Sequence, residues 1–300
     1  MDKKLIVITG PTACGKTALS VALAKELGCP ILSADSRQFY KELSIGTAKP
    51  SKEEMMGVTH YFVDSHSIHT PITSGQFEKE AIELLENLYQ THDQVILTGG
   101  SGMFLKALTH GTDQLPHNEK IRAKWNAIYE KEGIDTLKNK VKELDAEALE
   151  NLDINNPVRL IRVLELMEIT GEKISKLRKN KTAKRNFESI YFIIDHDRKA
   201  LYERINKRVD QMIHNGLIQE TKAVKEFMHL QPLNTVGYKE IFDFLDGQHD
   251  RESAIELIKR NTRRYAKRQL TWFRGMENAY WVEFDTLEKM KSIILNQLND

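Results

Sequence analysis

Eight residues near the start of the chain combine a glycine-rich turn with a lysine and a hydroxyl group. They read Gly10-Pro11-Thr12-Ala13-Cys14-Gly15-Lys16-Thr17, after the apolar run Leu5–Ile8 and before an amphipathic helical pattern. Glycines let backbone N–H groups turn inward around an anion, and a helix N-terminus and Lys16 add positive charge. Thr17 supplies a hydroxyl ligand suited to Mg²⁺. The segment predicts a phosphate loop that binds a di- or triphosphate.

Two further segments place special residues at predicted strand ends. Asp35 closes the run Ile31–Ala34. A carboxylate there can hold Mg²⁺ through water or accept a proton from a nucleophile, although it could instead cap a helix. The run Val95–Thr98 ends in Gly99-Gly100-Ser101-Gly102 and not in an acid, which argues against a motor or a GTPase. This glycine run is either a simple turn or a backbone that approaches a ligand closely.

The order of apolar and amphipathic segments predicts an α/β fold. Such alternation is typical of a doubly wound parallel sheet of the P-loop NTPase type, which binds ligands at the carboxyl ends of its strands. Residues 1–112 and 186–300 are expected to form this core. Strands are predicted at Leu5–Thr9, Pro30–Ala34, Val95–Thr98, Ile190–Asp195 and Tyr280–Phe284, and helices at Lys16–Leu27, Gly75–Thr91 and Leu201–Met228.

The interval 113–185 breaks this alternation. Its patterns are helical throughout, so the sequence predicts an inserted all-helical subdomain between two core strands. The expected helices are Asn118–Gly133, Ile134–Leu144, Ala146–Leu152 and Pro157–Arg178.

Composition predicts a soluble, cytoplasmic protein. Two cysteines, Cys14 and Cys29, offer neither a disulfide framework nor a zinc set. No apolar stretch approaches the length of a membrane span, and the N-terminus lacks the apolar segment of a signal peptide. A monomer is expected because no long apolar helix face is left over.

Seven segments follow one another as they do in one enzyme family. From the first strand to near residue 284 the chain resembles the tRNA dimethylallyltransferases. Ser101 and Phe104 depart from the Thr and Tyr that are usual there, and Asp153-Ile154-Asn155 departs from a common His-Pro-Asn, which puts a fine contact of the insertion in doubt. The seven segments are Gly10–Thr17, Asp35–Tyr40, Ile45–Pro50, Gly99–Phe104, Arg159–Glu165, Val236–Glu240 and Tyr265–Phe273.

The resemblance implies transfer of a dimethylallyl group from dimethylallyl diphosphate to N6 of the adenosine just 3′ of the anticodon of a tRNA. It implies that the loop Gly10–Thr17 holds the diphosphate with Mg²⁺ and that Asp35 is the general base. Thr17 corresponds to a hydroxyl at the leaving diphosphate, Ser101 to a residue of the channel between the two substrates, and Arg208 to an arginine that grips the diphosphate.

The resemblance also implies contacts with tRNA, including the anticodon arm, from both the core and the insertion. These contacts are Asp35, Ser36, Arg37, Gln38, Ser101, Arg122, Val158, Arg159, Leu160, Ile161, Arg162, Asn234, Thr235, Val236, Gly237, Tyr238 and Lys239.

Two basic segments give independent support for a nucleic-acid partner. Residues 155–185 hold nine Lys and Arg against three acids, and residues 257–275 hold seven Lys and Arg and no acid. Lys259, Arg263 and Lys267 step by four, as do Arg260, Arg264 and Arg268, which predicts one broad basic helix face that includes Arg263, Arg264 and Lys267 as tRNA contacts. Solvated helix faces are the alternative. Tyr265, Trp272 and Phe273 interleave, either for packing or for stacking on bases.

Two other functions share some of these features. A P-loop small-molecule kinase would have the same loop, strand-end Asp and helical lid, but it would not need the basic segments. A non-catalytic RNA-binding protein would be expected to lack Asp35, Lys16 or Thr17, and all three are present. Consumption of ATP without RNA would identify the kinase, and RNA binding without product would identify the binding protein.

Overall fold

The chain folds into two compact units. The computed structural model describes residues 3–113, 115–177 and 183–299. The core unit comprises Met1–His110 and Lys184–Asp300, and the insertion unit comprises Gly111–Ala183. The insertion predicted from the sequence, 113–185, differs from this unit by two residues at each end.

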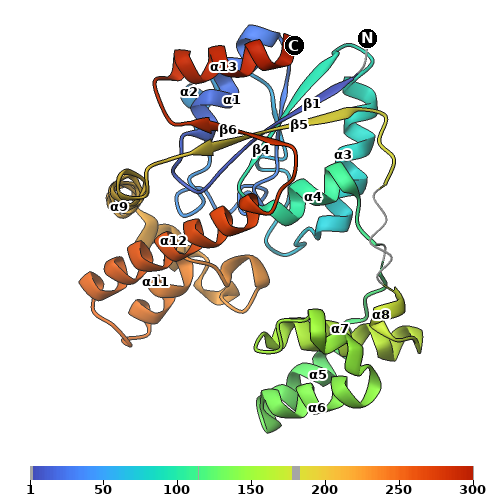
Figure 1. Cartoon of the computed structure of the whole chain (residues 1–300). Helices are drawn as coiled ribbons and strands as arrows, with labels where there is room; N and C mark the ends of the chain where they lie inside the picture. The colour runs from blue at the N-terminus through green and yellow to red at the C-terminus, as the bar shows by residue number, and fades with distance from the viewer. Residues whose placement is uncertain (1–2, 114, 178–182, 300) are drawn as a thin grey trace. The chain divides into compact units, whose positions relative to one another are not determined.

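Six parallel strands form the sheet of the core unit (Figure 1). Their spatial order is β3-β2-β4-β1-β5-β6, so the prediction of a doubly wound parallel sheet is confirmed. All five predicted strands are present to within two residues. The two-residue strand β3 was not predicted, because so short a segment carries no periodic pattern. The strands are β1 Lys4–Thr9, β2 Ile31–Ser33, β3 His60–Tyr61, β4 Gln94–Gly99, β5 Glu188–Asp195 and β6 Ala279–Glu283.

Helices cover both faces of this sheet because successive strand residues point to opposite sides. Leu5 and Val7 of β1 join a buried cluster with α3 (Ser74–Leu88) and α4 (Gly102–His110). Ile6 and Ile8 join a second cluster with α1 (Lys16–Leu27) and α13 (Leu287–Asn299). In Figure 1, α1 and α13 accordingly lie on one side of the strands and α3 and α4 on the other. A strand buried on both faces reads as a continuous apolar run, as the sequence shows.

A third buried cluster joins the remaining helices of the core unit, except for α2, which has no buried residue. The predicted single helix Leu201–Met228 is wrong: it is interrupted after His214, and Gly216 adopts a left-handed conformation with φ of 101°. Gly216 breaks the helix because its backbone takes that conformation at little cost. These elements are α2 Lys52–Met55, α9 Arg198–His214, α10 Leu217–Ala223, η2 Lys225–Phe227, η3 Gln231–Leu233, α11 Tyr238–Leu245 and α12 Arg251–Arg274.

All the secondary-structure elements in the described residues of the insertion unit are helices, as predicted. Its helix α7 ends at Thr170 because Gly171 is left-handed with φ of 69°. The predicted helix Pro157–Arg178 therefore ends too late, and its last residue lies outside the described part of the chain. The elements are α5 Glu119–Glu132, α6 Ile134–Leu144, η1 Ala146–Asn151, α7 Pro157–Thr170 and α8 Ile174–Leu177. Among the described residues of the whole chain, no helix is both long enough and apolar enough to cross a membrane.

Candidate active site

The sheet order brings three predicted segments together. Strands β2, β4 and β1 are neighbours and parallel, so the residues that follow them meet at one edge of the sheet. These are Asp35 after β2, the glycine turn 99–102 at the end of β4, and the phosphate loop 10–17 after β1. A cavity of about 1020 Å³ opens there, lined among others by Thr12, Lys16, Thr17, Asp35 and Arg208.

The phosphate loop has the conformation that its glycines allow. Gly10 has φ of 147°, and a Cβ at this position would lie 2.9 Å from the Cys14 sulfur and 3.0 Å from the Ile194 carbonyl oxygen. Helix α1 begins at Lys16 after the left-handed Gly15, which has no side chain with which to cap it. The Lys16 Nζ donates hydrogen bonds to the carbonyl oxygens of Gly10 and Pro11, at 3.0 and 2.8 Å. A lysine and the N-terminus of a helix therefore face the same cavity, which favours an anion.

Two arginines of α9 donate hydrogen bonds to the phosphate loop. Arg208 Nη1 donates to the Thr12 hydroxyl at 3.2 Å, and Arg204 Nε donates to the Ala13 carbonyl oxygen at 2.8 Å. Burial lowers the pKa of Arg208, whereas the nearby Asp35 carboxylate opposes this effect. A guanidinium keeps its charge in proteins, so Arg208 is a half-buried cation beside the phosphate loop.

Asp35 lies in a tight turn and not at a helix N-terminus. Its Oδ1 accepts a hydrogen bond from the Arg37 N–H at 3.1 Å. Ser36 bonds to Ser101 of the glycine turn twice: the Ser36 N–H donates to the Ser101 hydroxyl at 3.2 Å, and the two hydroxyl oxygens are 3.0 Å apart. A Cβ at Gly99 would lie 2.6 Å from the carbonyl carbon of Ala34. The glycine run is therefore required for close approach of two backbones, and it holds Asp35 at the cavity.

A second cavity of about 240 Å³ lies in the core unit next to these residues. Arg37 and Tyr265 line both cavities. Burial and the Asp35 carboxylate raise the pKa of Tyr265, and a hydrogen bond with Ser101 partly opposes them. The Tyr265 side chain is therefore uncharged, and it lines both cavities. The sequence pattern predicted only packing or stacking for Tyr265. The second cavity is also lined by Ser36, Met103, Phe104, Asn234, Thr235 and Val236.

The loop 44–50, which lines the first cavity, is held by Glu220 of α10. This carboxylate accepts hydrogen bonds from the N–H groups of Ser44, Ile45 and Gly46 at 2.8–2.9 Å and from the Tyr238 hydroxyl at 2.7 Å. Nothing in the spacing of Glu220 indicated this role.

Several predicted tRNA contacts in the core unit have partners within the protein. Tyr238 is 0% exposed, so its side chain cannot reach an RNA, and its prediction as a contact is corrected. Arg37 Nη2 donates to the carbonyl oxygens of Gly46 and Val236 at 3.0 and 2.6 Å. Gln38 Nε2 donates to the Ala48 carbonyl oxygen at 3.3 Å. Gly237 is buried, and its N–H donates to Glu240. Asn234 and Lys239 are exposed and Thr235 is half-buried.

The basic residues of α12 do not form the single face predicted: some contact α9 and others are exposed. Lys259 pairs with Asp210 of α9 at 2.8 Å, and Arg263 Nη1 donates to the Asn206 side chain of α9 at 2.5 Å. These two side chains pack toward a neighbouring helix, so the single broad face is wrong. The exposed basic residues of this stretch are Arg260, Arg264, Lys267, Arg268 and Arg274.

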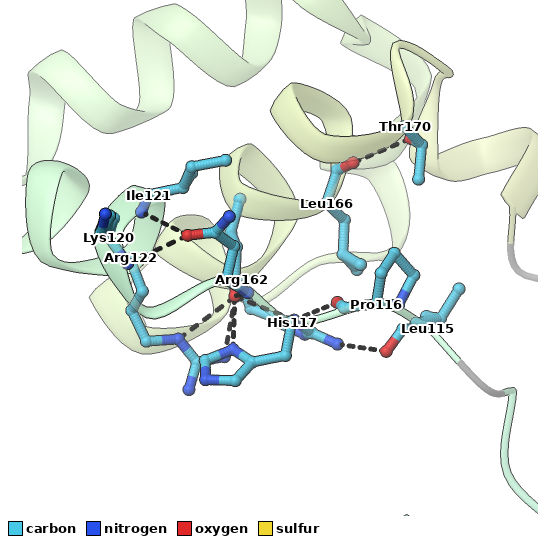
Figure 2. A network of polar contacts seen from close by, with 11 residues as sticks. Leu115, Pro116, His117, Lys120, Ile121, Arg122, Arg162, Leu166 and Thr170 are labelled. Atoms are coloured by element: carbon cyan, nitrogen blue, oxygen red, sulfur yellow. Dashed lines mark hydrogen bonds and ion pairs between the residues drawn. The ribbon is translucent and has the colours of Figure 1, made fainter.

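In the insertion unit, three basic side chains bond to the buried Glu165. Figure 2 shows these side chains, His117, Arg122 and Arg162, gathered at one place. Arg122 Nη2 and Arg162 Nη1 each donate to Glu165 Oε2 at 2.8 Å, and His117 Nδ1 lies 2.5 Å from Oε1. Burial disfavours the charged carboxylate, but hydrogen bonds from Arg162, the Asn118 N–H, Arg122 and His117 lower the pKa of Glu165 from 4.5 to about 2. Arg122 and Arg162, both predicted as tRNA contacts, therefore belong to a structural network.

The other predicted contacts of the insertion unit fall into two groups. Leu160 and Ile161 are 0% and 4% exposed in the core of the unit, and this corrects the prediction that their side chains contact tRNA. Val158 is 73% exposed, and Arg159 is also exposed. The helical period explains the division, because successive residues of α7 are rotated by about 100° around its axis, so only part of a five-residue segment faces the core.

The donor set at the first cavity fits Mg²⁺ that is bound together with a diphosphate. The described residues contain no group of three or more His, Cys, Asp or Glu side chains placed to hold a metal ion by themselves. The Thr17 hydroxyl and the Asp35 carboxylate line the same cavity. Mg²⁺ usually takes one or two protein oxygens and completes its shell with water and substrate phosphates.

Comparison with known proteins gives one consistent result. The profile of the IPP transferase family matches residues 38–276. The chain is 48% identical over 290 residues to the tRNA dimethylallyltransferase of Christiangramia forsetii and 43% identical over 301 residues to that of Cytophaga hutchinsonii. These alignments cover 96% of both chains in the first case, and 100% of this chain and 99% of the relative in the second.

Solved structures agree. A tRNA isopentenylpyrophosphate transferase from Bacillus halodurans superimposes with a TM-score of 0.73 at 35% identity, over 99% of this chain and 97% of that one. A eukaryotic dimethylallyltransferase acting on tRNA superimposes with a TM-score of 0.80 at 25% identity, over 99% of this chain and 77% of that one.

Proposed function

This chain belongs to the IPP transferase family, and we propose that it transfers a dimethylallyl group from dimethylallyl diphosphate to a tRNA. The acceptor is N6 of the adenosine just 3′ of the anticodon, and diphosphate leaves. One observation carries the proposal: Asp35 lines the large cavity beside the phosphate loop, while the next residue, Ser36, lines the second cavity. A carboxylate at this junction can serve a substrate in each cavity.

The phosphate loop supports binding and departure of the diphosphate. Lys16, the half-buried Arg208 and the first turn of α1 place positive charge around one side of the first cavity. Positive groups that are already in position stabilise the charge that develops on the leaving oxygen as the allylic C–O bond breaks, and one such donor contributes about 3–4 kcal/mol in comparable sites. When bound, Mg²⁺ would be held by Thr17, and by Asp35 through water, and would neutralise further charge on the diphosphate.

The second cavity supports binding of the target base. An adenine that has left its stack needs polar partners for its edge and a flat neighbour for its face. Ser36, Asn234 and Thr235 line the cavity with polar groups, and Tyr265 supplies an aromatic ring. As the amine nitrogen forms its bond to the allylic carbon, Asp35 accepts the proton that this nitrogen loses.

The partners follow from this reaction. We propose that the protein acts as a monomer in the cytoplasm on dimethylallyl diphosphate and the anticodon arm of tRNA. Exposed basic residues of α12 would bind phosphates of the RNA, and Val158 and Arg159 of α7 are the exposed members of the predicted contact set in the insertion unit. A P-loop kinase would have no use for these side chains.

The test is incubation of the protein with unmodified tRNA, Mg²⁺ and radiolabelled dimethylallyl diphosphate. We expect label in the tRNA, and we expect Asp35→Asn to reduce turnover by roughly 10²–10⁴-fold, because the amide cannot accept the proton. Asp195→Asn is the matched control: Asp195 also ends a strand, and its carboxylate bonds to the His196 N–H. Unlabelled tRNA together with consumption of ATP would support the kinase instead.

A further inference from the structure

One side chain of α12 joins the phosphate loop to the glycine turn. Gln269 is 6% exposed. Its Oε1 accepts a hydrogen bond from the Thr12 N–H at 2.9 Å, and its Nε2 donates to the Gly100 carbonyl oxygen at 2.8 Å. A glutamine can donate and accept at the same time, so a single amide satisfies two backbone groups that follow different strands.

The surroundings leave this amide little freedom. A Cβ at Gly100 would lie 2.4 Å from Gln269 Nε2. Thr12 is held at a second point, because its hydroxyl accepts a hydrogen bond from Arg208 at 3.2 Å. Gln269, Arg208 and Thr12 all line the first cavity. The phosphate loop is thus attached to α12 through its backbone, and to α9 through the Thr12 hydroxyl and the Ala13 carbonyl oxygen.

We propose that Gln269 is the positioning residue that fixes the phosphate loop for the diphosphate. This inference rests on the proposed function of the first cavity. Because Gln269 accepts the hydrogen bond of the Thr12 N–H, the curvature of the loop is set before the ligand binds. Lys16 and the first turn of α1 then point toward the same anion. Binding groups that are already ordered lose less conformational entropy when the ligand binds.

Two substitutions in the full chain test these hydrogen bonds. Gln269→Met retains the length of the side chain and removes both bonds. Gln269→Glu retains an acceptor for the Thr12 N–H, but it sets a carboxylate oxygen against the Gly100 carbonyl oxygen. Thr109→Val is the control for stability: Thr109 is 6% exposed, its hydroxyl lies 2.5 Å from the Tyr191 hydroxyl, and it lines neither cavity.

The measurements are calorimetric affinity for dimethylallyl diphosphate without RNA, KM for each substrate, and Tm. We expect Gln269→Met and Gln269→Glu to weaken affinity for the diphosphate at least tenfold, as loss of a buried polar contact typically does, with KM for tRNA within twofold of wild type. Thr109→Val should lower Tm by about as much as the Gln269 substitutions do, and it should leave both KM values unchanged.

Diphosphate affinity of Gln269→Met within twofold of wild type would overturn the inference and leave the proposed function standing. Equal loss of diphosphate affinity in Thr109→Val would also overturn it, because the effect would then follow stability alone. A wild-type protein that binds no dimethylallyl diphosphate would overturn the proposed function and, with it, the inference.

Discussion

At the scale of single residues, the site depends on glycines that permit close contact between backbones. Gly99→Ala would place a Cβ 2.6 Å from the carbonyl carbon and oxygen of Ala34, and neither atom can move without shifting β2. We expect this variant to lose about 1–3 kcal/mol of unfolding free energy, as overpacked cores do, and to lose turnover because Asp35 shifts. Denaturant unfolding and the labelling assay measure the two effects.

A matched glycine controls for the added methyl group itself. Gly275 follows α12 with φ of −87°, and the nearest atom to a Cβ there would be 3.4 Å away. Gly275→Ala should therefore retain both stability and turnover. If the two variants behave alike, the short distance at Gly99 is not what constrains the site.

Residues whose roles depend on neighbours in the chain could be predicted from the sequence. Asp35 directly follows an apolar run, and Lys16 and Thr17 end the glycine loop that follows another, so local context alone indicates phosphate chemistry at a strand end. Gln269 and Glu220 could not be predicted. Their backbone partners lie more than 150 residues away, and glutamine or glutamate on a helix is otherwise an ordinary surface residue.

At the scale of elements, α12 has two functions on different faces. Tyr265, Gln269 and Trp272 are spaced along one ridge. Tyr265 lines both cavities, Gln269 joins the two loops, and Trp272 packs against Gly102. Arg264 is exposed, whereas Arg263 donates to Asn206 of α9. We expect Arg264→Ala to weaken tRNA affinity and to reduce the slope of log affinity against log salt by about one, since one phosphate contact is lost.

Arg263→Ala, one residue away, is the matched variant. It should lower Tm and retain the salt slope of the wild type, because its partner is a side chain of the protein. Filter binding at several salt concentrations and thermal unfolding distinguish the two. Equal salt slopes for wild type and Arg264→Ala would exclude Arg264 as a phosphate contact. Periodicity predicted both arginines on one helix, but it could not show which ridge α9 would cover.

At the scale of the whole molecule, the core unit and the insertion unit are stabilised by separate networks of polar contacts. Glu165 has its partners Arg122, Arg162 and His117 within the insertion unit, whereas the phosphate loop has its partners within the core unit. Each unit also has its own buried apolar clusters. The sequence predicted this division from the loss of strand and helix alternation, but not the carboxylate at the centre of the insertion network. The pattern around Glu165 is that of an ordinary charged helix.

This separation predicts that acid destabilises the insertion through one group. The pKa of Glu165 falls from 4.5 to about 2, so its contribution is complete above pH 4.5 and is lost as pH falls toward 2. The shift corresponds to about 3 kcal/mol. Hydrogen exchange on the full chain should show protection of α5 and α7 decreasing over this range. Glu165→Gln should lower that protection at pH 7 and remove most of its dependence on pH, whereas the exposed Glu143→Gln should match wild type. Equal pH dependence in wild type and Glu165→Gln would assign the acid sensitivity to other carboxylates.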